Sequence, residues 1–169
     1  MARTAEKLDK AAPQQAQPEF DTVDTIKKQK GQSGYQMKPS LDIIKQTYIQ
    51  EMGDEKGYDD FIKKLASLLQ DPNVKLVRFL NTMFLLMRVS EDTVETKIFS
   101  LDPPDLIAMA IRDAAKMLKG FGFKKATSMS NLPIFVEIAQ KTGLPVKISQ
   151  SQMMMNGQAV PAYMFELDL

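Results

Sequence analysis

Apolar residues recur at steps of three and four in five stretches of the chain, the spacing that places them on one face of an α-helix. Leu41, Ile44 and Tyr48 show this spacing in the first stretch, and Ser40 stands where a helix cap is expected. Glycines that follow several of the stretches are typical helix stops. The pattern predicts helices over residues 41–52, 59–70, 73–88, 104–119 and 131–142.

The third predicted helix, residues 73–88, is apolar nearly all round. A helix with so little polar surface lies at the centre of a domain or in an interface between subunits. We therefore expect Phe79 and Leu80 to be residues of the main core.

Two segments between the helices are less regular. Residues 120–130 contain two aromatic residues beside glycines, and they predict a loop. Residues 90–100 leave two interpretations open, a short helix capped by Ser90 or a strand through Val94 and Ile98.

The C-terminal segment changes from helical spacing to alternation, which is typical of strands. Asn156-Gly157 divides it, and this dipeptide favours the tight turn of a β-hairpin because both central residues of that turn need positive φ. Met154 should face away from Met153 and Met155, and Pro161 suggests an edge strand because proline donates no ladder hydrogen bond. The residues expected to pack the hairpin against the helices are Val146, Ile148, Tyr163 and Phe165.

Residues 1–38 are rich in Gln, Pro, Ser and Gly and have few large apolar residues. Such a segment buries too little apolar surface to offset its ordering entropy, so it predicts a flexible or extended arm. Phe20, Val23, Ile26 and Tyr35 are spaced like anchors for a partner, and a plain disordered terminus is the alternative. Residues 39–169 then form a single helical domain, mainly α with about five helices and a C-terminal β-hairpin.

Charge and composition restrict the function. The net charge of +1 creates no global field toward nucleic acid or anionic lipid. The start of the chain has no secretory signal, and no apolar run is long enough to span a membrane. We expect a location in the cytoplasm or within a viral particle.

The chain has no histidine and no cysteine, which removes the commonest general base and the usual ligands of zinc, haem and iron–sulfur clusters. These absences predict no catalytic residue, no cofactor and no metal. A carboxylate site for Mg²⁺ near Asp54, Glu55, Asp59 and Asp60 is the exception, although acids are also favoured at a helix start.

Three functions follow from these observations. The leading hypothesis is a non-enzymatic adaptor or structural subunit of a larger complex, a virion component among the options, in a homo- or hetero-oligomer. Its arm and apolar surface, including Met153 and Met155, would contact other protein subunits. The second is a winged-helix-like nucleic-acid-binding protein that uses Lys124, Lys125, Lys141 and Lys147. The third is a small Mg²⁺-dependent carboxylate enzyme.

Overall fold

A computed structural model describes residues 34–169. Four helices lie in this part of the chain: α3 (Ser40–Met52), α4 (Tyr58–Leu68), α5 (Pro104–Gly120) and α6 (Ile134–Lys141). Its strands are β1 (Val74–Phe79), β2 (Thr82–Arg88), β3 (Thr93–Ser100), β4 (Lys125–Ser130), β5 (Val146–Met155) and β6 (Gln158–Asp168).

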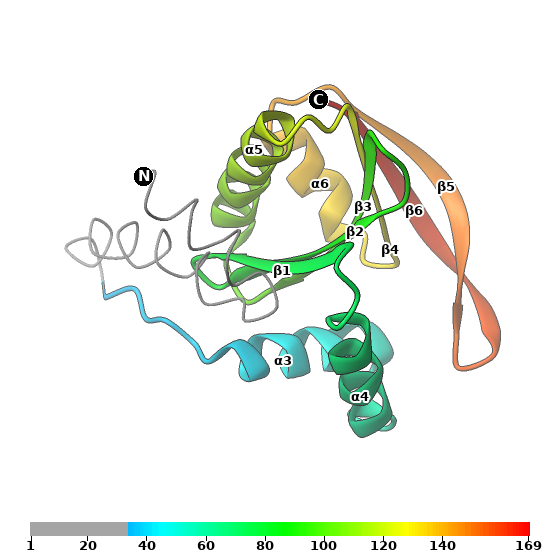
Figure 1. Cartoon of the computed structure of the whole chain (residues 1–169). Coiled ribbons are helices and arrows are strands. Elements are labelled where there is room, and N and C mark those ends of the chain that lie inside the picture. Colours follow the sequence, from blue (N-terminus) through cyan, green and yellow to red (C-terminus); the bar gives the residue numbers. More distant parts are fainter. Residues whose placement is uncertain (1–33) are drawn as a thin grey trace.

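The strands form one six-stranded mixed sheet in the order β1-β2-β3-β4-β6-β5. Only β3 and β4 pair in parallel; the other neighbours are antiparallel. Helices α3 and α4 cover one face of the sheet, and α5 and α6 cover the other (Figure 1). We call these the α3 face and the α5 face. The fold is therefore α+β around a central sheet, and the prediction of a mainly α domain is wrong.

Each face of the sheet holds its own core. On the α3 face, Ile43, Ile44 and Leu65 pack against strand residues that include Phe99. On the α5 face, small residues of α5 such as Ala110 let the helix lie close to β1, β2 and β3. Alternation along the strands supplies both cores, because successive side chains point to opposite faces.

The predicted helix over residues 73–88 is wrong, because these residues form β1 and β2. Both strands are covered on both faces, so their side chains are apolar without alternation, and such a run has no period that separates strand from helix. The sequence does not predict the turn between them either, because Leu80 has a φ of 57°, which leucine rarely adopts. Leu80 is 1% exposed and Phe79 packs on the α5-face core, so both contribute to the core as expected.

Two further segments are strands. Residues 93–100 form β3, which resolves the open choice between helix and strand. Residues 125–130, predicted as loop, form β4. The remaining four helices lie close to their predicted positions, although Pro39 and not Ser40 is the residue before α3, and the Ser40 hydroxyl accepts a hydrogen bond from Arg78.

The C-terminal hairpin is confirmed as β5 and β6. Asn156 and Gly157 both have positive φ, 51° and 76°. Met154 is 68% exposed, whereas Met153 faces the opposite way and lines a cavity on the α3 face. The expectation that Pro161 marks an edge strand is wrong, because β6 lies between β4 and β5, and β5 is the hairpin strand at the edge of the sheet. The pairing of β6 with β4 begins at Tyr163, so Pro161 lies just before it.

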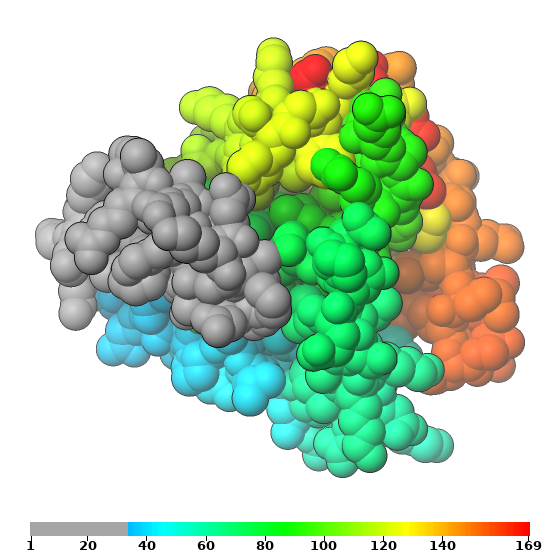
Figure 2. All heavy atoms as spheres, viewed as in Figure 1, coloured from blue at the N-terminus to red at the C-terminus, as the bar shows by residue number. Residues whose placement is uncertain are grey.

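No helix within residues 34–169 is both long and apolar enough to cross a membrane. Figure 2 shows α4 and the β5–β6 hairpin projecting from the body of the molecule.

Candidate functional site

The parallel pair β3–β4 separates part-way along its length. Pairing ends at Thr96 opposite Ser128, yet β3 continues to Ser100 and β4 continues to Ser130. On their outer sides both strands stay paired, β3 with β2 and β4 with β6. The sheet therefore has a split at the carboxyl ends of its only parallel pair, the edge at which α/β sheets place their ligands.

Cavities open on both faces of the sheet at this split. The α3-face cavity has a volume of about 540 Å³ and runs between α4 and the hairpin residues Met153 and Met164. The α5-face cavity is smaller, about 90 Å³, and lies between the sheet, α5 and α6. The residues that line both are those where the strands part: Thr96, Lys97, Thr127, Ser128 and Met129. Two separate ligands could thus meet at the split.

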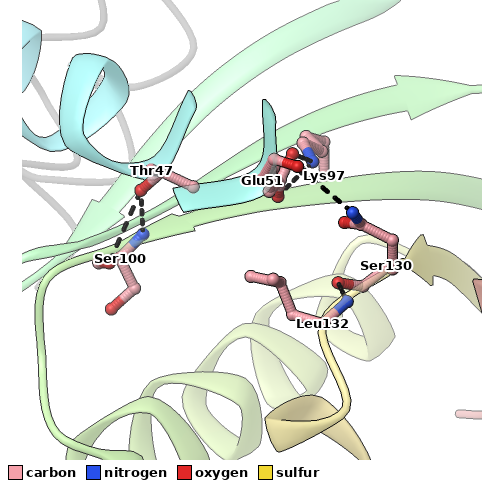
Figure 3. A network of polar contacts seen from close by, with 7 residues as sticks. Thr47, Glu51, Lys97, Ser100, Ser130 and Leu132 are labelled. Atoms are coloured by element: carbon pink, nitrogen blue, oxygen red, sulfur yellow. Dashed lines mark hydrogen bonds and ion pairs between the residues drawn. The ribbon is translucent and has the colours of Figure 1, made fainter. Parts of the chain in front are cut away.

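Helix α3 reaches the free edge of β3 beyond the split. The Thr47 hydroxyl accepts a hydrogen bond from the Ser100 N–H at 3.0 Å and donates one to the Ser100 carbonyl at 3.4 Å (Figure 3). One threonine side chain therefore satisfies a peptide group that would otherwise pair with β4. Ile98, two residues earlier, has no β4 residue opposite it, and it leaves a peptide group for a ligand.

A charged pair closes the centre of the split. The Lys97 ammonium donates to both carboxylate oxygens of Glu51 at the end of α3, at 2.6 and 2.5 Å (Figure 3). The Glu51 side chain is only 12% exposed. Such a pair is stronger than a surface ion pair because little water screens it.

Asn131, directly after β4, adds an unusual polar atom. Its Nδ2 donates to the Glu51 main-chain carbonyl at 3.2 Å, which fixes the orientation of the amide. Its Oδ1 is buried, and it is the one buried side-chain oxygen or nitrogen of the described residues that has no hydrogen-bond partner. Buried acceptors are almost always satisfied, so this oxygen is an exception, and Asn131 itself lines neither of the two cavities.

The loop from β3 to α5 is held by a buried carboxylate. Asp102 accepts hydrogen bonds from the Tyr35 hydroxyl at 2.7 Å, the Asn81 N–H at 2.9 Å and the Thr82 hydroxyl at 2.8 Å. Burial raises the pKa of Asp102, while these hydrogen bonds act to lower it. Burial, and then the hydrogen bond to Asp102, raise the pKa of Tyr35.

The structure separates most residues that the sequence singled out. Met153 lines the α3-face cavity and Met155 lies further along β5, near the hairpin turn. Tyr35 is hydrogen-bonded within the chain, and Phe20, Val23 and Ile26 lie outside the described residues.

The four lysines of the nucleic-acid hypothesis are placed apart or beside acids. Lys141 pairs with Asp105 at 3.1 Å and Lys147 with Asp168 at 3.6 Å. Lys124 and Lys125 lie at the start of β4, with Lys125 opposite Asp168. In the described part of the chain, no group of three or more acids, the Asp54–Asp60 segment included, could hold a metal ion.

The chain is similar to known proteins in its structure but not in its sequence. No protein-family model and no curated protein matches the chain. Among solved structures, the chain is similar to the microcin self-immunity acetyltransferase MccE, solved with acetyl-CoA and AMP: TM-score 0.55, 12% identity, 77% of this chain and 84% of that chain covered. An N-acetyltransferase from Staphylococcus aureus gives a TM-score of 0.52 at 11% identity and covers 79% and 96% of the two chains.

The chain has the fold of GNAT acetyltransferases. A chimeric spermidine N-acetyltransferase from Vibrio cholerae is similar as well, with a TM-score of 0.50, 12% identity and 68% and 77% of the chains covered. The GNAT fold contradicts the predicted structural subunit and virion component, because the similar structures are enzymes. The fold is not a winged helix either.

Sequence reasoning missed Glu51, Lys97 and Asn131. Each looks ordinary in the sequence: Glu51 and Lys97 are typical of solvated charges, and Asn131 is the first residue of a predicted helix. A correct assignment of β3 and β4 as parallel strands is the one signal that would have directed attention to the residues after their carboxyl ends.

Proposed function

We propose that this chain is an acyltransferase that moves an acyl group from a thioester to an amine at the split between β3 and β4. One observation carries the proposal: two cavities on opposite faces of the sheet share their lining residues at the point where the parallel strands part. A transfer between two substrates needs such a meeting point, and the similar structures are acetyltransferases.

The transfer itself makes and breaks defined bonds. The amine nitrogen attacks the thioester carbonyl carbon, a C–N bond forms, and the C–S bond breaks. The nitrogen loses one proton and the sulfur leaves as a thiolate that is then protonated. The site must therefore hold the amine, accept its proton and exclude water.

Glu51 is the residue suited to accept the proton. Its carboxylate is largely shielded from solvent, and its orientation is fixed by Lys97, which lines both cavities. The peptide group of Ile98 is suited to an amide-bearing donor arm, because no β4 residue pairs with it.

The acceptor occupies the α3-face cavity in this proposal. Its walls are mainly apolar, with Phe61, Leu68 and Met87 beside Lys64 and Glu95. An amine with an apolar body fits this lining, since its nitrogen can lie near the carboxylates while the body contacts the methionines and leucines.

Coenzyme A is the donor that the GNAT fold implies, and the residues fit only part of it. The split fits an acyl-bearing arm with amide groups. The starts of α5 and α6 do not fit phosphates, because most of their first N–H groups are missing at prolines or already bonded within the chain.

The test is release of free thiol from acetyl thioesters in the presence of primary amines, beginning with spermidine. The chain contains no cysteine, so a thiol reagent reports the leaving group without protein background. We expect Glu51→Gln to lower kcat by about 10²-fold or more, as for loss of a general base.

Glu55→Gln is the matched control, because Glu55 lies close in sequence but pairs with Lys45 on the surface. Equal activity of Glu51→Gln and the unchanged chain would remove Glu51 from the reaction. Absence of thiol release with every thioester and amine tried would contradict the proposed function.

A further inference from the structure

We infer that the donor of this chain is recognised through its acyl and pantetheine-like arm alone, and that the nucleotide of coenzyme A adds nothing to its binding. The inference rests on the proposed function, which it makes more specific. It comes from a mismatch between the starts of two helices and the phosphates they would have to hold.

Phosphates bind where helix N-termini present free N–H groups at the carboxyl ends of strands. Helix α5 follows β3 and α6 follows β4, so both begin at the edge where the split opens. A diphosphate attached to a donor arm in the split would meet one of these two helix starts.

Helix α5 offers almost no donors there. Pro103 and Pro104 have no N–H. The N–H groups of Leu106 and Ile107 are both bonded to the Pro103 carbonyl, at 3.0 and 3.1 Å. This leaves Asp105, which contributes one N–H and a carboxylate that is 83% exposed. No glycine is present to bring the backbone close to a phosphate.

The charges at this helix start also provide no net attraction for an anion. Asp102 lies two residues before Pro104, with both carboxylate oxygens already used by Tyr35, Asn81 and Thr82. The nearby guanidinium of Arg78 is engaged by the Leu80 and Lys38 carbonyls and the Ser40 hydroxyl. Asp105 pairs with Lys141 at 3.1 Å and Asp102 lies near Arg78, so these charges offset one another and leave no net positive charge to attract a diphosphate.

Helix α6 is no better. Pro133 precedes it without an N–H, and the N–H groups of Phe135 and Val136 are bonded to the Leu132 and Pro133 carbonyls. Its first turn carries Glu137, a further negative charge.

The split itself suits a slim, uncharged arm. The α5-face cavity is lined in part by small side chains, Ala114, Ala115, Ala126 and Ser128, beside larger apolar ones, and the peptide group of Ile98 faces the split. These features recognise an acyl chain and amides, and they need no phosphate. The donor class is an acyl thioester of a pantetheine-like thiol.

The experiment compares acetyl-CoA with acetyl-pantetheine on the full chain, in turnover and in binding. Calorimetry with CoA, pantetheine and adenosine 3′,5′-bisphosphate measures affinity independently of any acceptor amine. We expect CoA and pantetheine to bind within about three-fold of each other, and no binding of the bisphosphate; two charge-assisted hydrogen bonds to phosphate would instead be worth about 10²-fold or more. We also expect the CoA affinity to be insensitive to salt.

The outcomes separate the inference from the proposed function. Equal binding of CoA and pantetheine supports the inference, whether or not turnover is seen. Binding of CoA more than about 10²-fold tighter than pantetheine overturns it even if the chain is an active acetyltransferase. Binding of neither compound also overturns it, because the arm alone must bind. Binding of pantetheine without turnover of any thioester contradicts the proposed function only.

Discussion

At the scale of single residues, Asp102 determines how α5 begins. Its carboxylate joins three parts of the chain: Tyr35 before α3, the β1–β2 turn through Asn81, and the β3–α5 loop. Asp102 is 8% exposed. Burial raises its pKa above the ordinary 3.8, so the folded chain keeps the proton to a higher pH than the unfolded chain does.

This shift predicts a pH dependence with a defined sign. Between pH 3.8 and the raised pKa, the folded state binds more protons than the unfolded state, so the stability contribution of Asp102 is lost as pH rises. We expect the unfolding free energy of the unchanged chain, minus that of Asp102→Asn, to decrease from about pH 3.5 to pH 7 in urea titrations. Asp105→Asn is the control for loss of an exposed acid. An increase with pH would mean that the hydrogen bonds outweigh burial.

At the scale of elements, the hairpins β1–β2 and β5–β6 differ in whether the turn residues themselves predict the turn. The β5–β6 turn uses Asn156 and Gly157, both suited to positive φ. The β1–β2 turn uses Leu80 at positive φ, and its conformation is maintained by the Arg78 side chain on the Leu80 carbonyl and by Asp102 on the Asn81 N–H. The β5–β6 turn is determined locally, whereas the β1–β2 turn depends in part on a distant residue, Asp102.

Gly157→Val tests the local turn. A β-branched residue at a φ of 76° is strained, and we expect a loss of about 1–3 kcal/mol in unfolding free energy. Gly120→Val is the matched control, since Gly120 has ordinary φ and open space around it, and valine is no worse than glycine in a helix. A loss of equal size in both variants would show that the effect does not come from the turn.

At the scale of the whole molecule, residues 35–38 connect the start of the described chain to the sheet. The Gln36 carbonyl accepts from the Asn81 Nδ2, and Arg78 donates to the Lys38 carbonyl. Together with the Tyr35–Asp102 bond, these contacts close one end of the α3 face. The extent of the predicted arm, residues 1–38, stays a prediction.

A pair of truncations tests these contacts. A chain that begins at residue 34 keeps Tyr35 and Gln36, and a chain that begins at residue 37 lacks both. We expect the second to unfold at lower temperature, because Asp102 and Asn81 each lose a hydrogen bond at a part-buried site, at about 1–3 kcal/mol for each group left unsatisfied. Equal midpoints by calorimetry would show that water replaces both bonds without cost.

The pattern of residues predicted roughly half of the architecture. Helices α3, α4, α5 and α6 and the β5–β6 hairpin lie close to where apolar spacing and Asn156-Gly157 predicted them. The sheet was not accessible: residues 73–88 carry no strand period because both faces of β1 and β2 are covered. With the sheet missed, the site could not be predicted either.

What the sequence by itself determined is local: helix faces repeat within a turn or two, and a tight turn needs only two residues that tolerate positive φ. What the tertiary structure decided is the meeting of distant residues. Glu51 is 46 positions from Lys97 and 80 from Asn131, and no period connects them. They come together because β3 and β4 part at Thr96 and Ser128 while α3 packs across the opening. That juxtaposition arises from packing between elements, and packing leaves no repeating signal in the order of the residues.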